Sequence, residues 1–273
     1  MSTPVDLYDN AYGNYAAEIY RQVRIATYGE DFGQTSWVTN EESKEIPQAL
    51  AITLVSRVLE IGCGSGGYAL HVAETTGCTV VGVDVNEAGI RNGKALSRAR
   101  NLSDRVLFEH CDASQKLPFP DATFDAAFAN DVLCHIPGRP ALLQEVLRVL
   151  KPQGRLLFSD ALVIGGAISH EEVATRSSIG YYLFSPPGYN ERLIQEAGFR
   201  SVLVNETTEN TACIARRWRD ARDSLRDALI AVEGRENFDG LQQFLSCVCR
   251  MSQERRLLRY LYVAQKDCES TVT

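Results

Sequence analysis

The segment Leu59–Gly67, LEIGCGSGG, constrains the fold of this chain more than any other stretch. Its glycines Gly62, Gly64 and Gly67 have the G-x-G-x-x-G spacing of loops in which the backbone closely approaches a bound cofactor. The run RVLEI before the loop is typical of a strand, and GGYALHVAETTG after it is typical of a helix. Because this spacing is informative only between a strand and a helix, the context predicts a ligand-binding strand–loop–helix unit.

Strand and helix patterns alternate along the chain beyond this loop. Apolar runs are followed by segments with helical periodicity, an order typical of a parallel sheet with right-handed crossovers. In such sheets ligands bind beyond the carboxyl ends of the strands. The predicted strands are residues 57–61, 79–84, 105–110, 124–131 and 154–160, and the predicted helices are residues 66–77, 86–101 and 139–150.

Acidic residues stand near the ends of the first three predicted strands. A carboxylate at Glu60 would repel a pyrophosphate but attract the sulfonium and ammonium groups of S-adenosylmethionine. Asp84 would accept hydrogen bonds from both ribose hydroxyls. Asp112 would accept from the adenine amino group, although taken alone it suits a helix N-cap equally well. We therefore predict S-adenosylmethionine as the cofactor. The core residues predicted to bind it are Glu60, Gly62, Cys63, Gly64, Gly66, Asp84, Val85, Asp112, Ala113 and Asn130.

Across residues 57–160 the motifs VLEIGCGSGGYAL, VVGVDVNE, HCDA and FDAAFANDVLCHI follow in order, and the chain resembles the class I S-adenosylmethionine-dependent methyltransferases. The resemblance implies an α/β, Rossmann-like, seven-stranded, mostly parallel sheet with helices on both faces. Its sixth strand would be residues 200–205 and its antiparallel last strand residues 256–265. The implied organisation is an N-terminal helical cap and cofactor-covering loop (1–55), a cofactor-binding core (56–205), a two-helix cap insertion (206–252) and a last strand with tail (253–273).

One subgroup, the phosphoethanolamine and sarcosine/dimethylglycine N-methyltransferases, is similar in further segments. YGEDFGQTSW resembles the subgroup's loop over the methionine end of the cofactor, which implies contacts from Gln34, Thr35, Ser36 and Trp37. NDVLCHI resembles the segment that carries a histidine paired with an N-terminal tyrosine. The implied catalytic residues are His135, Tyr15 and Tyr20, and the candidate substrate residues are Tyr181, Tyr182 and Arg250. A phosphate-binding cation of the subgroup has no counterpart in SSIGYYLF, so the phosphorylated substrate is not carried over.

Purely structural roles compete with several of these assignments. Tyr8, Tyr12, Tyr15 and Ile19 fall at helical spacing, and such a stripe more often packs than reacts. His135 is as well explained by a solvent-facing loop or a helix cap as by a place at the substrate site. The segment SPPG after the fifth strand is interpreted as a turn before a helix.

Composition narrows the range of partners. The 273-residue chain has a net charge of −7, which argues against a nucleic-acid partner. Its start has no signal-peptide pattern, and no apolar run reaches the ~20 residues that cross a membrane. Eight scattered cysteines and four histidines form no zinc pattern, which favours free thiols and a cytoplasmic location.

Three functions remain open from the sequence. The favoured one is N-methylation of a small-molecule amine, because a closed cap suits a small acceptor. O-methylation of a small hydroxylated metabolite is the alternative, and a non-catalytic S-adenosylmethionine-binding module is less favoured. A nucleotide-dependent dehydrogenase is a remote fourth interpretation.

Overall fold

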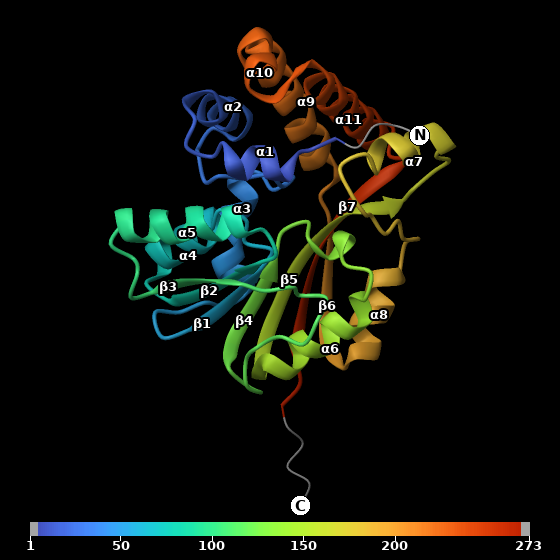
Figure 1. Cartoon of the computed structure of the whole chain (residues 1–273). Coiled ribbons are helices and arrows are strands. Elements are labelled where there is room, and N and C mark those ends of the chain that lie inside the picture. The colour runs from blue at the N-terminus through green and yellow to red at the C-terminus, as the bar shows by residue number, and fades with distance from the viewer. Residues whose placement is uncertain (1–4, 269–273) are drawn as a thin grey trace, which may run out of the picture.

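The computed structural model describes residues 5–268, and a seven-stranded sheet lies at its centre (Figure 1). The strand order is β3-β2-β1-β4-β5-β7-β6. The strands from β3 to β5 pair in parallel, whereas β7 pairs antiparallel with both β5 and β6. The predicted Rossmann-like fold with an antiparallel last strand is therefore confirmed. The strands are β1 (Arg57–Ile61), β2 (Thr79–Asp84), β3 (Val106–His110), β4 (Phe124–Ala129), β5 (Leu150–Ile164), β6 (Phe199–Glu206) and β7 (Leu257–Lys266).

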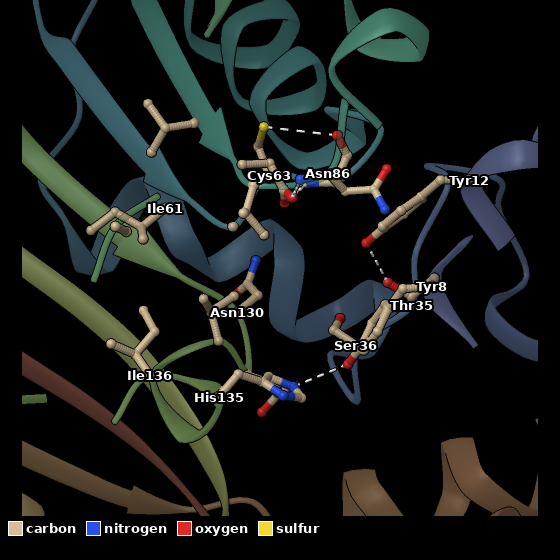
Figure 2. Close-up of a pocket in the computed structure, with 18 of the residues that line it drawn as sticks. Tyr8, Tyr12, Thr35, Ser36, Ile61, Cys63, Asn86, Asn130, His135 and Ile136 are labelled. Carbon is tan, nitrogen blue, oxygen red and sulfur yellow. Dashed lines mark hydrogen bonds between the residues drawn. The ribbon is translucent and has the colours of Figure 1, made fainter. Parts of the chain in front are cut away.

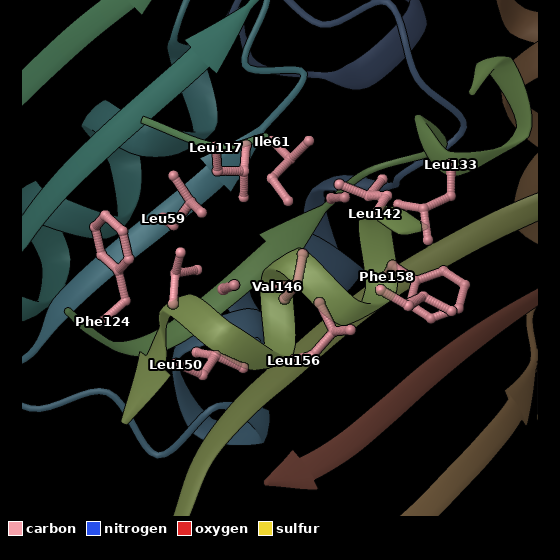
Figure 3. Packing of buried hydrophobic residues seen from close by; sticks show 14 of the residues in the cluster. Leu59, Ile61, Leu117, Phe124, Leu133, Leu142, Val146, Leu150, Leu156 and Phe158 are labelled. Carbon is pink, nitrogen blue, oxygen red and sulfur yellow. The ribbon is translucent and has the colours of Figure 1, made fainter. Parts of the chain in front are cut away.

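Helices cover both faces of the sheet, which is why the inner strands are buried along most of their length. α6 and α8 pack on one face, where Leu142 and Val146 lie against Leu59 and Phe158 (Figure 3). α3, α4 and α5 pack on the other face, around Leu70 and neighbouring apolar residues. The core helices are α3 (Asn40–Ala49), α4 (Gly67–Thr76), α5 (Glu87–Ala99), α6 (Arg139–Val149) and α8 (Tyr189–Ala197), and the short 3-10 helix η1 is Leu133–His135.

A second group of helices lies beyond the carboxyl ends of the strands, at the top of Figure 1. All of them except α7 share an apolar cluster that includes Trp218 and Phe244 and the loop residue Trp37, and α7 packs on α11. We call this group the cap. Its helices are α1 (Tyr8–Gly13), α2 (Glu18–Tyr28), α7 (His170–Arg176), α9 (Thr208–Ser224), α10 (Arg226–Glu233) and α11 (Arg235–Gln253).

Two features of the cap differ from the sequence-based expectation. The insertion forms three helices rather than two, because Gly234 adopts a positive φ of 81° that ends α10 before α11 begins. The tyrosine stripe does not lie on one helix, because α1 ends at Gly13 and α2 begins at Glu18. The side chains of that stripe therefore point to different parts of the molecule.

Candidate functional site

A cavity of about 460 Å³ lies between the carboxyl ends of β1, β2 and β4 and the cap. Figure 2 shows Tyr8, Thr35 and Ser36 on one side of it and Asn130 and His135 on the other. Small-molecule sites have volumes of roughly 300–1,000 Å³. The cavity therefore lies where an open α/β sheet binds its ligand and has the size that a small molecule needs.

The glycine loop forms the floor of this cavity. Gly64 has a φ of 51°, and a Cβ there would lie 2.5 Å from the Tyr12 hydroxyl oxygen. A Cβ on Gly67 would overlap the carbonyl oxygen of Phe32. The loop between α2 and α3, residues 29–39, therefore lies directly on the start of α4, and we call it the covering loop. Of the predicted glycine-loop residues, Gly62, Cys63 and Gly64 line the cavity and Gly66 does not.

Asp84 stands at the cavity wall and is tied to the glycine loop. Its Oδ2 accepts the Gly64 N–H at 2.7 Å, and its Oδ1 accepts the Asn86 N–H at 2.7 Å. Burial raises the pKa of Asp84 above its ordinary value. Val85, Asp112 and Ala113 line the same end of the cavity, and hydrogen bonds from Ser114 lower the pKa of Asp112.

Glu60 has a different setting from the one expected. It is 1% exposed and is absent from the cavity lining, because its side chain lies beneath the glycine loop. Burial, with a smaller effect of the Asp84 charge, raises the pKa of Glu60 well above its ordinary value. One of its carboxyl oxygens has no hydrogen-bond partner among the described residues. Direct contact of Glu60 with a cofactor stays a prediction.

The covering loop supplies polar groups from the cap side. The Thr35 and Tyr12 hydroxyls lie 3.0 Å apart, and the Ser36 hydroxyl lies 3.0 Å from that of Tyr68. Gln34, Thr35 and Ser36 line the cavity, as the resemblance implied. Trp37 does not, because its indole packs against the cap, with its ring centroid 6.2 Å from that of Phe244.

Asn130 presents an unused hydrogen-bonding group to the cavity. It is 8% exposed, and neither its Nδ2 nor its Oδ1 has a partner within residues 5–268. A buried amide without partners is costly, so a ligand with both a donor and an acceptor would satisfy it. The glycine loop leaves space that larger side chains would occupy, and the Asn130 amide has no partner. Both features fit a bound S-adenosylmethionine.

His135 and Tyr8 meet at the opposite end of the cavity. The Tyr8 hydroxyl lies 3.0 Å from His135 Nε2, and His135 Nδ1 lies 3.2 Å from the carbonyl oxygen of Tyr181. A carbonyl only accepts, so Nδ1 carries the proton, and the unprotonated Nε2 accepts from the Tyr8 hydroxyl. Burial, with a smaller effect of the nearby Arg176 charge, lowers the pKa of His135 from 6.5 to about 4. The imidazole is therefore neutral near pH 7.

The structure brings Tyr8, rather than Tyr15 or Tyr20, to His135. Tyr15 lies in the turn after α1, where the Arg24 guanidinium stacks on its ring at 4.5 Å. Tyr20 donates its hydroxyl proton to Glu233 at 3.0 Å within the cap. Neither tyrosine lines the cavity, because the break between α1 and α2 turns them away from Tyr8.

Of the three candidate substrate residues, only Tyr181 lines the cavity. Tyr181 is half-exposed. The Tyr182 ring packs against His135 at a tilt of 40° with centroids 4.4 Å apart, and it is not part of the lining. Arg250 lies on the surface, where it donates to Glu172 at 3.0 Å. Arg250 is not among the residues that line the cavity.

A buried cation that the sequence did not reveal lies behind these residues. Arg176 is 1% exposed, and its guanidinium lies 4.2 Å from the Tyr182 ring centroid and 5.0 Å from that of Phe244. Its Nε and Nη1 have no hydrogen-bond partner in the described part of the chain. It stands just before the segment SSIGYYLF, which was expected to offer no cation, and only its position at the end of α7 brings it near His135.

Other kinds of site are not found in residues 5–268. No group of three or more histidine, cysteine or acidic side chains there is arranged to hold a metal ion. The eight cysteines are all free. None of the helices that the structure describes is both long and apolar enough to span a membrane.

Comparison with known proteins identifies a family domain in this chain. Residues 59–158 match the family model described as a methyltransferase domain. A phosphoethanolamine N-methyltransferase of Triticum aestivum is 31% identical over 224 residues, which are 81% of this chain and 44% of that protein. The chain thus spans about half the length of the curated relatives it matches.

Two solved structures have a similar fold. Phosphoethanolamine N-methyltransferase 2 of Haemonchus contortus, in complex with phosphomonomethylethanolamine and S-adenosylhomocysteine, has a TM-score of 0.79 at 21% identity, covering 95% of this chain and 60% of that one. The [4+2]-cyclase SpnF has a TM-score of 0.72 at 21% identity, covering 98% and 100%. At these identities the likeness concerns the fold alone, and the reaction has to be argued from the residues of the cavity.

Proposed function

The chain carries a class I S-adenosylmethionine-dependent methyltransferase domain, and on that premise we propose that it transfers a methyl group from S-adenosylmethionine to a small-molecule amine. The observation that supports this most is the His135–Tyr8 pair, which lies in one cavity with Asn130, Asp84 and the glycine loop (Figure 2). In this proposal residues 56–205 bind the cofactor, residues 5–39 and 206–252 cover it, and α3 packs on the sheet instead.

In this proposal each part of the cofactor has its own binding residues at one end of the cavity. Asp84 holds the ribose hydroxyls, the Asp112–Ala113 segment the adenine, and Asn130 with Thr35 and Ser36 the methionine moiety. S-adenosylmethionine supplies an activated methyl group on a sulfonium, so the transfer needs no covalent help from the protein. The residues then contribute alignment and exclusion of water, for which effective molarities of ~10⁵–10⁸ M are known.

His135 and Tyr8 act at the acceptor's end. The amine nitrogen forms a bond to the methyl carbon as the carbon–sulfur bond breaks, and the proton lost from nitrogen passes to His135 Nε2. Burial keeps the Tyr8 hydroxyl protonated by raising its pKa, so in the absence of acceptor it donates to Nε2 and holds the ring in place. Burial lowers the pKa of His135 to about 4, so Nε2 carries no proton near pH 7. The same shift makes it a weaker base than an ordinary histidine, so it takes the proton at the moment of transfer and passes it on to solvent.

Arg176 supports a finer proposal about the acceptor, an amine that also carries an anionic group. Two of its guanidinium nitrogens have no partner within residues 5–268, and it stands behind Tyr182 at the acceptor's end of the cavity. A small rotation of the Tyr182 ring would open it to a phosphate or carboxylate, which a guanidinium binds through paired hydrogen bonds. The wheat relative is named for phosphoethanolamine, an acceptor of this class.

O-methylation is the second candidate, because a neutral His135 Nε2 would accept a hydroxyl proton as readily as an amine proton. The two are separated by a turnover assay that detects S-adenosylhomocysteine with phosphoethanolamine, ethanolamine and a simple phenol as acceptors. We expect turnover with amines and a lower KM for phosphoethanolamine than for ethanolamine. Turnover with phenol alone would move the assignment to O-methylation, and no turnover with any acceptor would contradict the proposal.

The anionic preference has its own control. Arg176→Met should raise the KM for phosphoethanolamine by at least roughly tenfold, the equivalent of one charge-assisted hydrogen bond, and leave that for ethanolamine nearly unchanged. Arg250→Met, a surface substitution outside the cavity, should change neither value.

A further inference from the structure

A fully buried arginine on the last strand joins two acidic side chains from distant parts of the chain. Arg259 is 0% exposed, and its Nε donates to Asp131 Oδ1 at 2.8 Å. Its Nη1 donates to Glu42 Oε2 at 2.9 Å, and its Nη2 lies 2.8 Å from Glu42 Oε1. Glu42 is on α3 and Asp131 follows β4, so one guanidinium links three elements of the core.

Asp131 connects this arginine to the covering loop. Its Oδ2 accepts the backbone N–H of Trp37 at 2.9 Å, and its Oδ1 also accepts the Ser159 hydroxyl at 2.9 Å. Asp131 has a φ of 59°, a left-handed conformation in which Asp and Asn are the favoured side-chain-bearing residues. The two residues before Trp37 line the cavity, as Asp131 itself does, so this hydrogen bond ties the covering loop to the cavity wall.

Glu42 connects the same arginine to the cap. Asn210 of α9 donates its Nδ2 to Glu42 Oε2 at 2.7 Å. The Arg259 backbone N–H donates to Thr208 Oγ1 at 3.0 Å, and its Nη1 donates to Thr207 Oγ1 at 2.8 Å. Arg259 thus contacts the start of α9 directly and the covering loop through Asp131.

We propose that Arg259 is a positioning residue that fixes the covering loop over the cavity by orienting Asp131 toward the Trp37 amide, and that it registers this loop to the start of α9. The planar guanidinium is essential because it serves two carboxylates in fixed directions, which a single ammonium cannot do. The inference rests on the proposed function only in taking the cavity for the cofactor site.

The direct readout is hydrogen exchange at the Trp37 amide in the protein without ligand. Arg259→Lys keeps the charge but loses the fork, so we expect exchange at Trp37 to accelerate by roughly tenfold or more, the scale of one charge-assisted hydrogen bond. The affinity for S-adenosylhomocysteine, measured by calorimetry, should fall by a similar factor. Arg222→Lys is the matched control, because Arg222 is 3% exposed and pairs with Glu233 in the cap. It should lower the melting temperature and leave Trp37 exchange unchanged.

Asp131→Asn decides the question if Arg259→Lys does not fold. Asn suits the left-handed backbone, but its amide cannot accept from both Trp37 and Arg259, so Trp37 exchange should again accelerate. Unchanged exchange at Trp37 in the folded variants would overturn the proposal and leave Arg259 as a structural ion pair. Because exchange is measured without cofactor or acceptor, this result does not depend on methyl transfer. Absence of turnover with every amine would contradict the proposed function and leave the role of Arg259 standing.

Discussion

The Tyr8 hydroxyl and His135 Nε2 lie 3.0 Å apart although 127 positions separate the two residues in the chain. Tyr8 comes from the first helix of the cap and His135 from the 3-10 helix after β4. Their contact fixes the His135 ring at one end of the cavity, where we propose that it takes up the acceptor's proton.

His135→Ala should lower the turnover number by roughly 10²–10⁴-fold, the usual contribution of a general base, and leave S-adenosylhomocysteine affinity nearly intact. Tyr8→Phe should lower turnover less, and the double variant should lose less than the sum of the two free-energy changes, because the residues act as one unit. Tyr20→Phe removes a hydroxyl that contacts Glu233 outside the cavity and should leave turnover unchanged. Wild-type turnover in His135→Ala would exclude the base.

The pH dependence follows from the pKa of His135, which is about 4 in the folded protein against 6.5 ordinarily. Turnover should therefore decline only as the pH falls toward about 4, and this limb should be absent in His135→Ala. The free energy of unfolding should fall in the same direction, as the pH is lowered. The unfolded chain binds more protons between pH 6.5 and 4, so the stabilisation from neutral His135 is complete above pH 6.5 and is lost as the pH falls through this window. Urea unfolding of wild type and His135→Gln at pH 7 and pH 5 measures it, and a difference independent of pH would contradict the low pKa.

Asp84→Asn should lower S-adenosylmethionine affinity by ~1.5–3 kcal/mol, the scale of a hydrogen bond to a charged group. The Asn amide can still accept one backbone N–H, but it places a donor against either Gly64 or Asn86, so the glycine loop should loosen as well. Calorimetry with S-adenosylhomocysteine checks this. Equal affinity in the two proteins would remove Asp84 from the ribose site.

Gly67→Ala should destabilise the fold by ~1–3 kcal/mol, as overpacking does, because its Cβ meets the Phe32 carbonyl of the covering loop. Gly138→Ala is the control, since its φ is −87° and nothing lies within 4 Å of a Cβ there. Thermal unfolding compares the two variants, and equal melting temperatures would show that the loop can move away without cost.

The core and its cofactor end could be predicted because they follow from short-range patterns. The glycine spacing, the β1–α4 boundary and the acids that end or follow strands depend on residues close in sequence, and a parallel sheet brings strand ends to one edge. The same reasoning put Glu60 at the ligand. Glu60 is buried and absent from the cavity lining, and its contact with the cofactor stays a prediction.

The acceptor's end could not be predicted because it depends on how the cap packs. Tyr8, Tyr15 and Tyr20 look alike in sequence, and only the turn between α1 and α2 decides which of them meets His135. Arg176 carries no motif, and its burial among Tyr182 and Phe244 results from the contact of α7 with α11. Such contacts join segments that are far apart in the sequence, and no periodicity in the sequence reveals them.

The place of β7 between β5 and β6 sets an order of assembly on the ribosome. Among the described residues β7 is the one strand that pairs with β6, and 51 positions separate Glu206 from Leu257. At ~5–20 residues per second, the finished β6 waits about 3–10 s for β7. β5 ends at Ile164, 93 positions before Leu257, so its edge stays open for about 5–19 s. Two unpaired edges of this kind are targets for chaperones and for premature association with other chains. Arg259 arrives on that last strand, so the covering loop gains its anchor only when synthesis of the sheet is complete.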